Sequence, residues 1–179
     1  MRTRLALALV LVLLVTGMAE AGVYYNTDTS TYYRYEDDNP NYETIVPAKG
    51  ESYAPSNLFG ERRLDISISP NGPVLRLATV PKANGGYAGM KQAIIASWKP
   101  LFTDLKVTSE ADYTNDLGVK FRFFEATGKT TSGSTGMIRF AAFTKGTDIV
   151  YVELFCTAGA YTGTVKDYWM KAIHSFKWR

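Results

Sequence analysis

The stretch GKTTSGSTG, residues 128–136, contains the residue types of a nucleotide-binding loop. Such a loop reads G-x-x-x-x-G-K-[ST] and opens a helix, so that its backbone N–H groups and its lysine contact phosphates. Here the residue five positions before Gly128 is Phe123 and not glycine. An alternating strand pattern follows the stretch, and no helix begins where a phosphate could meet its N-terminus. We therefore predict a long hairpin loop and no nucleotide site.

Other catalytic patterns are also missing from the sequence. His174 is the only histidine, so no histidine pair can hold zinc, and no G-x-S-x-G nucleophile elbow occurs. Cys156 is the only cysteine and stands in an apolar run, where we expect a small buried side chain. We predict no catalytic residue, no metal and no cofactor. A hydrolase that uses Cys156 or an unrecognised serine is the alternative.

Four residues of the C-terminal half are the candidates for a ligand site: Arg122, Arg139, Tyr151 and Glu153. If the loop at 128–136 closes symmetrically, Arg122 lies near Arg139 on the next strand. Alignment of the apolar positions of the following hairpin then places Arg139 near Glu153, with Tyr151 two residues along. Two adjacent arginines destabilise a sheet unless a carboxylate or a bound anion lies between them. The pattern predicts either an anionic or sugar-like ligand, or neutralisation of the arginines by Glu153 alone.

The elements that carry these residues follow from hydrophobic periodicity and turn signals. Alternating runs predict strands, and an apolar face at a spacing of three and four residues predicts helices. Met90, Ile94, Trp98 and Leu101 form such a face. The predicted strands cover residues 64–68, 74–80, 105–111, 119–126, 137–144 and 149–156, and the predicted helices cover 89–99 and 165–174. The order indicates one α+β domain over residues 57–179, an antiparallel sheet with helices packed on it.

Residues 22–56 differ in composition from this domain. They contain seven of the twelve tyrosines, an acidic run at residues 36–38 and no sustained period. We predict an irregular lead-in that wraps the domain, with one short strand at residues 44–46. Tyrosines at this density could also stack on a sugar or on a partner surface.

The N-terminal segment has the layout of a secretory signal peptide. Arg2 and Arg4 precede an apolar run from Leu5 to Val15, and Ala19-Glu20-Ala21 provides an A-x-A cleavage site. The run is shorter than the roughly 20 residues that span a bilayer. We expect cleavage between Ala21 and Gly22. No further long apolar segment follows in the sequence. The mature chain should therefore carry no stable membrane anchor and should be periplasmic or secreted.

The charge of the mature chain is nearly balanced. The full sequence has a formal net charge of +3, and loss of Arg2, Arg4 and Glu20 leaves +2. Nucleic-acid-binding domains usually carry a strong basic excess, so we expect no nucleic-acid partner.

The order of the elements resembles the PsbP-like superfamily, which includes the extrinsic photosystem II protein PsbP and a small Ran-binding import factor. The likeness covers about residues 60–178 and depends on the strand pair at 62–80, the helix with Trp98, and the meander GVKFRFFEATGKT, GMIRFAAFTKGT and DIVYVELFCTAG. The ending Ile173-His174-Ser175-Phe176 is similar to the I-x-S-F ending of that group. The resemblance implies an α/β/α sandwich and a non-catalytic adaptor.

We therefore expect an exported accessory protein that acts through contacts with another protein, an envelope protein of unknown identity. The alternative is a periplasmic binding protein for an anionic or sugar-like ligand at the four candidate residues.

Overall fold

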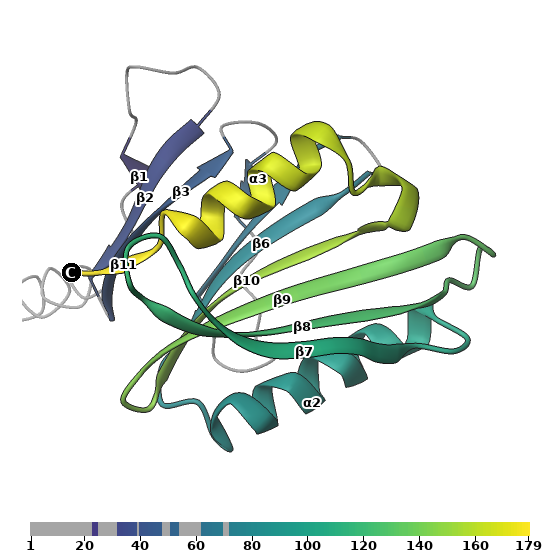
Figure 1. The fold of residues 1–179 in the computed structure, drawn as a ribbon, viewed down its shortest axis with the longest axis horizontal. Coiled ribbons are helices and arrows are strands. Elements are labelled where there is room, and N and C mark those ends of the chain that lie inside the picture. Colours follow the sequence, from purple (N-terminus) through teal and green to yellow (C-terminus); the bar gives the residue numbers. More distant parts are fainter. Residues whose placement is uncertain (1–22, 25–31, 39, 48–50, 54–61, 70–71) are drawn as a thin grey trace, which may run out of the picture.

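An antiparallel sheet of seven strands forms the centre of the computed structural model, which describes residues 23–24, 32–38, 40–47, 51–53, 62–69 and 72–179 (Figure 1). Its strands in chain order are β4 (Glu51–Tyr53), β5 (Arg62–Ser67), β6 (Val74–Val80), β7 (Lys106–Thr114), β8 (Lys120–Lys129), β9 (Thr135–Lys145) and β10 (Asp148–Thr157). Their order across the sheet is β4-β5-β6-β10-β9-β8-β7, so β7 lies at one edge. The meander from β7 to β10 is joined to the β5–β6 hairpin by pairing of β10 with β6.

Helices cover both faces of this sheet, which confirms the predicted α+β fold. Helix α2 (Gly86–Trp98) packs on one face, and helix α3 (Gly163–His174) packs on the other (Figure 1). A smaller sheet of four strands accompanies α3 on its face of the large sheet. Its strands are β1 (Val23–Tyr24), β2 (Tyr32–Asp38), β3 (Asn41–Pro47) and β11 (Lys177–Trp178).

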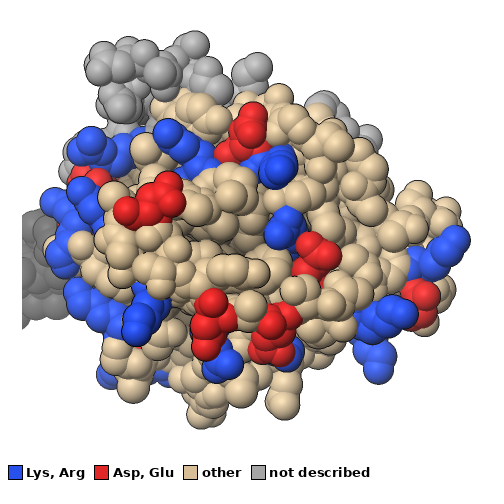
Figure 2. All heavy atoms as spheres, in the orientation of Figure 1, with Lys and Arg blue, Asp and Glu red and all other residues tan. Residues whose placement is uncertain are grey.

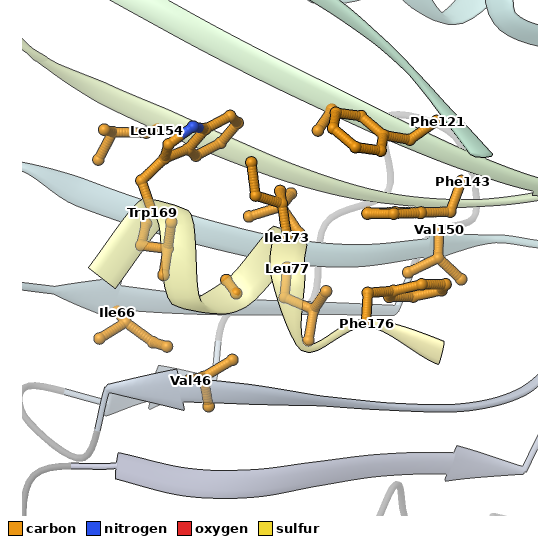
Figure 3. Packing of buried hydrophobic residues seen from close by; sticks show 14 of the residues in the cluster. Val46, Ile66, Leu77, Phe121, Phe143, Val150, Leu154, Trp169, Ile173 and Phe176 are labelled. Atoms are coloured by element: carbon orange, nitrogen blue, oxygen red, sulfur yellow. The ribbon is translucent and has the colours of Figure 1, made fainter. Parts of the chain in front are cut away.

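Each face of the large sheet has its own hydrophobic core, because alternate residues of a strand point to opposite faces. The core on the α3 side includes Leu77, Phe143, Val152, Trp169 and Phe176, and Figure 3 shows several of these side chains between α3 and the strands. The core on the α2 side includes Tyr87, Met90, Ile94, Phe124, Phe140 and Tyr151. The central strands β9 and β10 are therefore buried on both faces.

The predicted strands and helices are present with small changes at their ends. The loop at 128–136 is a hairpin turn, because β8 ends at Lys129 and β9 begins at Thr135. Leu101 was expected on the buried face of the first helix, and this was wrong. Helix α2 ends at Trp98, and Leu101 lies in the short 3-10 turn η1 (Lys99–Leu101), where it is 48% exposed. Pro100 has no backbone N–H for a longer α-helix, which explains this ending.

The prediction of an irregular segment at 22–56 was wrong for residues 32–38 and 41–47. These residues form the antiparallel β2–β3 hairpin. Tyr35 and Tyr42 are buried in the core on the α3 side, and the Tyr42 hydroxyl lies 3.0 Å from Thr79 Oγ1 of β6. The alternation of buried residues is real, but tyrosine and threonine occupy the inward positions, and their polar atoms hide the pattern.

The turn between β7 and β8 is fixed to the C-terminal end of α3 by Asn115. The buried Asn115 amide Nδ2 donates hydrogen bonds to the carbonyl oxygens of Ile173, at 3.0 Å, and Phe176, at 2.7 Å. Its Oδ1 accepts hydrogen bonds from the backbone N–H groups of Leu117 and Val119. The carbonyls at the end of a helix have no partner within the helix. Asn115 supplies one, and thereby holds α3 at a set position against the β7–β8 hairpin.

The predicted signal peptide, residues 1–21, lies outside the described residues, so its cleavage stays a prediction. Within the part of the chain that the structure describes, neither helix combines the length and apolar character needed to cross a membrane.

Candidate functional site

The four candidate ligand residues lie on two different faces of the large sheet. Arg139 is opposite Glu125 of β8 and Leu154 of β10, and its side chain is on the α3 side. Arg122 is opposite Ala142, in the same cross-strand row as Tyr151, on the α2 side. The predicted register paired Arg139 with Glu153 and was wrong, because Glu153 is opposite Phe140. A register shift of one residue moves a side chain to the other face.

Glu153 belongs instead to a row of alternating charges across three strands. Asp65 of β5 is opposite Arg76 of β6, and Arg76 is opposite Glu153 of β10. Arg76 Nη1 donates to Glu153 Oε2 at 2.8 Å, and Arg76 Nε donates to Asp65 Oδ1 at 2.8 Å. The indole Nε1 of Trp98, in the last turn of α2, donates to Glu153 Oε1. Sequence reasoning missed Arg76, although its position in an alternating strand beside Asp65 was a usable signal.

The environment of Glu153 is that of a buried structural charge. Burial raises the pKa of the Glu153 carboxyl, while Arg76 and the hydrogen bonds from Trp98 and Arg76 lower it. For Arg76, burial lowers the pKa, but Glu153 and Asp65 raise it above its ordinary value. The carboxylate is 1% exposed and its partners occupy both oxygens. One of the two interpretations of the sequence was neutralisation of Arg122 and Arg139 by Glu153. Glu153 does neutralise an arginine, but that arginine is Arg76.

Arg122 lies at an open hollow near the ends of β7, β8 and β9. Its Nε donates to Asp112 Oδ1 at 3.0 Å, and its guanidinium carbon lies 4.4 Å from the centre of the Tyr87 ring. The hollow has a volume of about 730 Å³ and is also lined by Lys120. Tyr151 is 1% exposed beneath this face, so it is not presented to a ligand there.

Arg139 lines a smaller pocket on the other face of the sheet. Its guanidinium carbon is 4.4 Å from the ring centre of Tyr161, 5.0 Å from Phe123 and 5.7 Å from Trp169. The nearest carboxylate oxygen, Glu125 Oε2, is 3.5 Å from Arg139 Nε. The pocket has a volume of about 160 Å³. Its walls are Tyr113, Phe121, Phe123, Arg139, Trp169, Met170, Ile173 and His174.

Cys156 and His174 are the side chains that the sequence offered for nucleophilic, acid–base or metal chemistry. Burial raises the pKa of the Cys156 thiol to about 11, and the side chain is 2% exposed, so a reactive thiolate is not available. His174 Nδ1 lies 2.7 Å from Asp116 Oδ1. Among the residues that the structure describes, no three His, Cys, Asp or Glu side chains gather where a metal ion could bind.

A seven-stranded antiparallel sheet between α2 on one face and α3 on the other defines an α/β/α sandwich. This is a PsbP-like fold. The solution structure of cyanobacterial PsbP from Synechocystis sp. PCC 6803 is similar to it with a TM-score of 0.62 and 12% sequence identity, over 88% of this chain and 98% of that one. At this identity the likeness concerns the fold, and it confirms the fold that the sequence resemblance implied.

A Pseudomonas aeruginosa protein of unknown function also has a similar structure, with a TM-score of 0.48 and 10% identity, over 83% of this chain and 98% of that one. No protein-family model and no curated protein matches the sequence.

Proposed function

We propose that the protein is an exported accessory protein that acts by binding another protein of the cell envelope, through the side of the molecule formed by β7. The observation that carries this proposal is the placement of the exposed large apolar side chains. Among the described residues these are Leu101, Val107, Tyr113 and Leu117, and all lie in β7, in η1 shortly before it, or in the turn after it. They are spread along this edge, with Val107 on the α2 face and Tyr113 on the α3 face of the sheet, where they are available to contact another protein.

The backbone of β7 favours recognition by side chains over addition of another strand. Lys106, Glu110 and Asp112 place charges along this edge, and the pairing with β8 is irregular between Val107 and Ser109. Charges and irregularities of this kind protect a sheet edge from non-specific pairing. A partner with an apolar patch and a polar rim fits such a surface.

The charge of the surface supports a protein partner over a polyanion. Lys, Arg, Asp and Glu side chains are interspersed over much of the face seen in Figure 2, although Lys and Arg gather at its left edge. The formal charge of the full chain is only +3. Nucleic-acid-binding surfaces are usually far more basic.

The proposal of export depends on the N-terminal pattern, with Arg2 and Arg4 before the apolar run and Ala19-Glu20-Ala21 after it. The proposal of a non-catalytic role is supported by the burial of Cys156, which raises the pKa of its thiol and argues against the hydrolase alternative that uses it.

The test combines the processed N-terminus with a surface variant. The protein is recovered from the envelope of its own cells and studied by native mass spectrometry, with an N-terminus at Gly22 and one co-isolated polypeptide expected. The double variant Tyr113→Ser with Leu117→Ser should reduce recovery of that polypeptide about tenfold, the change that a loss of roughly 1.4 kcal/mol in binding produces. Gln92→Ser with Lys99→Ser, two exposed positions at α2, is the matched control. Equal recovery with both variants would exclude the β7 side, and an N-terminus at Met1 would exclude export.

A further inference from the structure

Arg139 is a largely buried cation with few polar contacts in the part of the chain that the structure describes. A guanidinium has five N–H donors. Within the described residues, Arg139 Nε is buried without a hydrogen-bond partner, and Glu125 Oε2, at 3.5 Å, is beyond the usual N–H···O range of about 2.7–3.2 Å. Buried donors are nearly always paired in folded proteins. The contacts of Arg139 with Tyr161 and Trp169 involve the faces of the rings and use none of these donors.

The pocket above Arg139 offers one charged group and otherwise mainly apolar walls. Trp169, Met170 and Ile173 of α3 face Phe121 and Phe123 of β8 across it. Figure 3 shows Trp169 and Ile173 directed from α3 toward the strands, with Phe121 beside them. Because a water molecule occupies roughly 30 Å³ of liquid, a volume of about 160 Å³ holds a compact group and not a large ligand.

The charge balance selects the type of anion. Arg139 carries a positive charge, but Glu125 beside it is 26% exposed and carries a negative charge, so the pair is close to neutral. A dianion such as phosphate loses far more hydration against these apolar walls than a monoanion does, and a near-neutral pair does not offset that loss. A monocarboxylate with an apolar body matches both the in-plane donors of a guanidinium and the aromatic walls.

We propose that this pocket between α3 and β8–β9 binds a small organic monocarboxylate, with Arg139 donating hydrogen bonds to the carboxylate and with Trp169 and Phe123 contacting its apolar body. The site does not depend on the proposed protein partner, although Tyr113 belongs both to the β7 surface and to the lining of this pocket. It also differs from the predicted ligand site, since it uses only one of the four predicted residues.

The test is a titration of the ¹⁵N-labelled mature protein with benzoate, followed by NMR. The Nε–Hε signal of Arg139 and the indole Nε1–H signal of Trp169 should shift together and saturate. Benzamide, which has the same shape without the charge, and inorganic phosphate should leave both signals in place. An equal response to benzamide would show an apolar pocket in which Arg139 has no role, and an equal response to phosphate would show non-selective anion binding. Either result, or no shift up to the solubility limit of benzoate, would overturn the proposal.

Variants keep the test clear of folding effects. Arg139→Met should abolish the shift of the Trp169 signal. Met170→Glu retains Arg139 and adds a fixed carboxylate at the pocket wall, and it should weaken benzoate binding about tenfold. Arg122→Met removes an arginine on the other face and should leave binding unchanged. If Met170→Glu, with a native spectrum elsewhere, binds benzoate as well as the parent protein does, the pocket is not the site.

Discussion

Arg76 and Arg139 lie on opposite faces of the same sheet and are almost equally buried, with side chains 17% and 20% exposed. Their surroundings differ. Arg76 donates to two carboxylates at 2.8 Å, whereas Arg139 contacts three aromatic rings and has its nearest carboxylate at 3.5 Å. Exposure alone therefore does not separate a structural arginine from one that is open to a ligand. The two kinds of arginine differ in whether the guanidinium N–H groups donate hydrogen bonds to carboxylates of the protein.

The strongest test of this comparison is removal of Arg76. Arg76→Met leaves Glu153 buried without its cation, and breaking one side of a buried ion pair typically destabilises a protein by about 3–5 kcal/mol. We expect a loss of this size in the free energy of unfolding, measured by urea denaturation at neutral pH. A loss below about 1 kcal/mol, the range of exposed pairs, would show that the row Asp65–Arg76–Glu153 has no structural importance.

The same variant should depend on pH in a defined direction. Burial raises the pKa of Glu153 in the folded protein, so its contribution to stability is present below its ordinary pKa of about 4.3 and is lost as pH rises through the folded value. Without Arg76, which lowers this pKa, the folded value rises further. The deficit of Arg76→Met should therefore be smallest in acid and grow toward neutral pH. A deficit that is constant over this range would show that Glu153 does not titrate in the folded state.

A smaller effect is expected from the second donor to Glu153. Trp98→Phe removes the indole N–H but keeps an aromatic ring that can stack on Phe155, whose ring centre lies 4.5 Å away. A buried acceptor that loses its donor typically costs about 1–3 kcal/mol. Trp178→Phe is the matched control, because Trp178 contacts Phe176 and Lys145 through its rings and makes no hydrogen bond through its indole within the described chain. Equal losses in the two variants would mean that ring volume and not the Glu153 contact determines the result.

Sequence patterns located the fold because most elements bury one face. The hairpin of β5 and β6 and helix α3 show clear periodicity, and their predicted positions agree with the structure. The hairpin at 32–47 was not predicted, because Tyr35, Tyr42 and Thr44 occupy its inward positions. These side chains are compatible with burial and with solvent, so their alternation carries little signal.

The candidate site was harder to predict because it depends on register. In β10 both faces are buried, with Val152 and Leu154 on one side and Ile149 and Tyr151 on the other. A strand that is apolar on both faces gives no alternation by which to align it with its neighbour. The predicted β9–β10 pairing was displaced by one residue, and it therefore placed Arg139 opposite Glu153 and not opposite Leu154. The aromatic surroundings of Arg139 come from β8, η2 (Ala158–Ala160) with the residue after it, and α3, and no local pattern joins them.

The smallest expected effect completes the comparison. Arg139→Met removes a cation whose Nε has no hydrogen-bond partner among the described residues, and it keeps an unbranched apolar stem against Tyr161, Phe123 and Trp169. Loss of the cation–π contacts costs about 0.5–2 kcal/mol. Removal of a buried N–H group that has no hydrogen-bond partner offsets part of this cost. We expect a change of about 1 kcal/mol or less in the free energy of unfolding by the same urea measurement. A loss as large as that of Arg76→Met would mean that Arg139 is a structural residue like Arg76, and the ligand proposal would lose its basis. A near-neutral change would show that the fold holds an arginine that it does not need for stability, as expected of a residue kept available for binding.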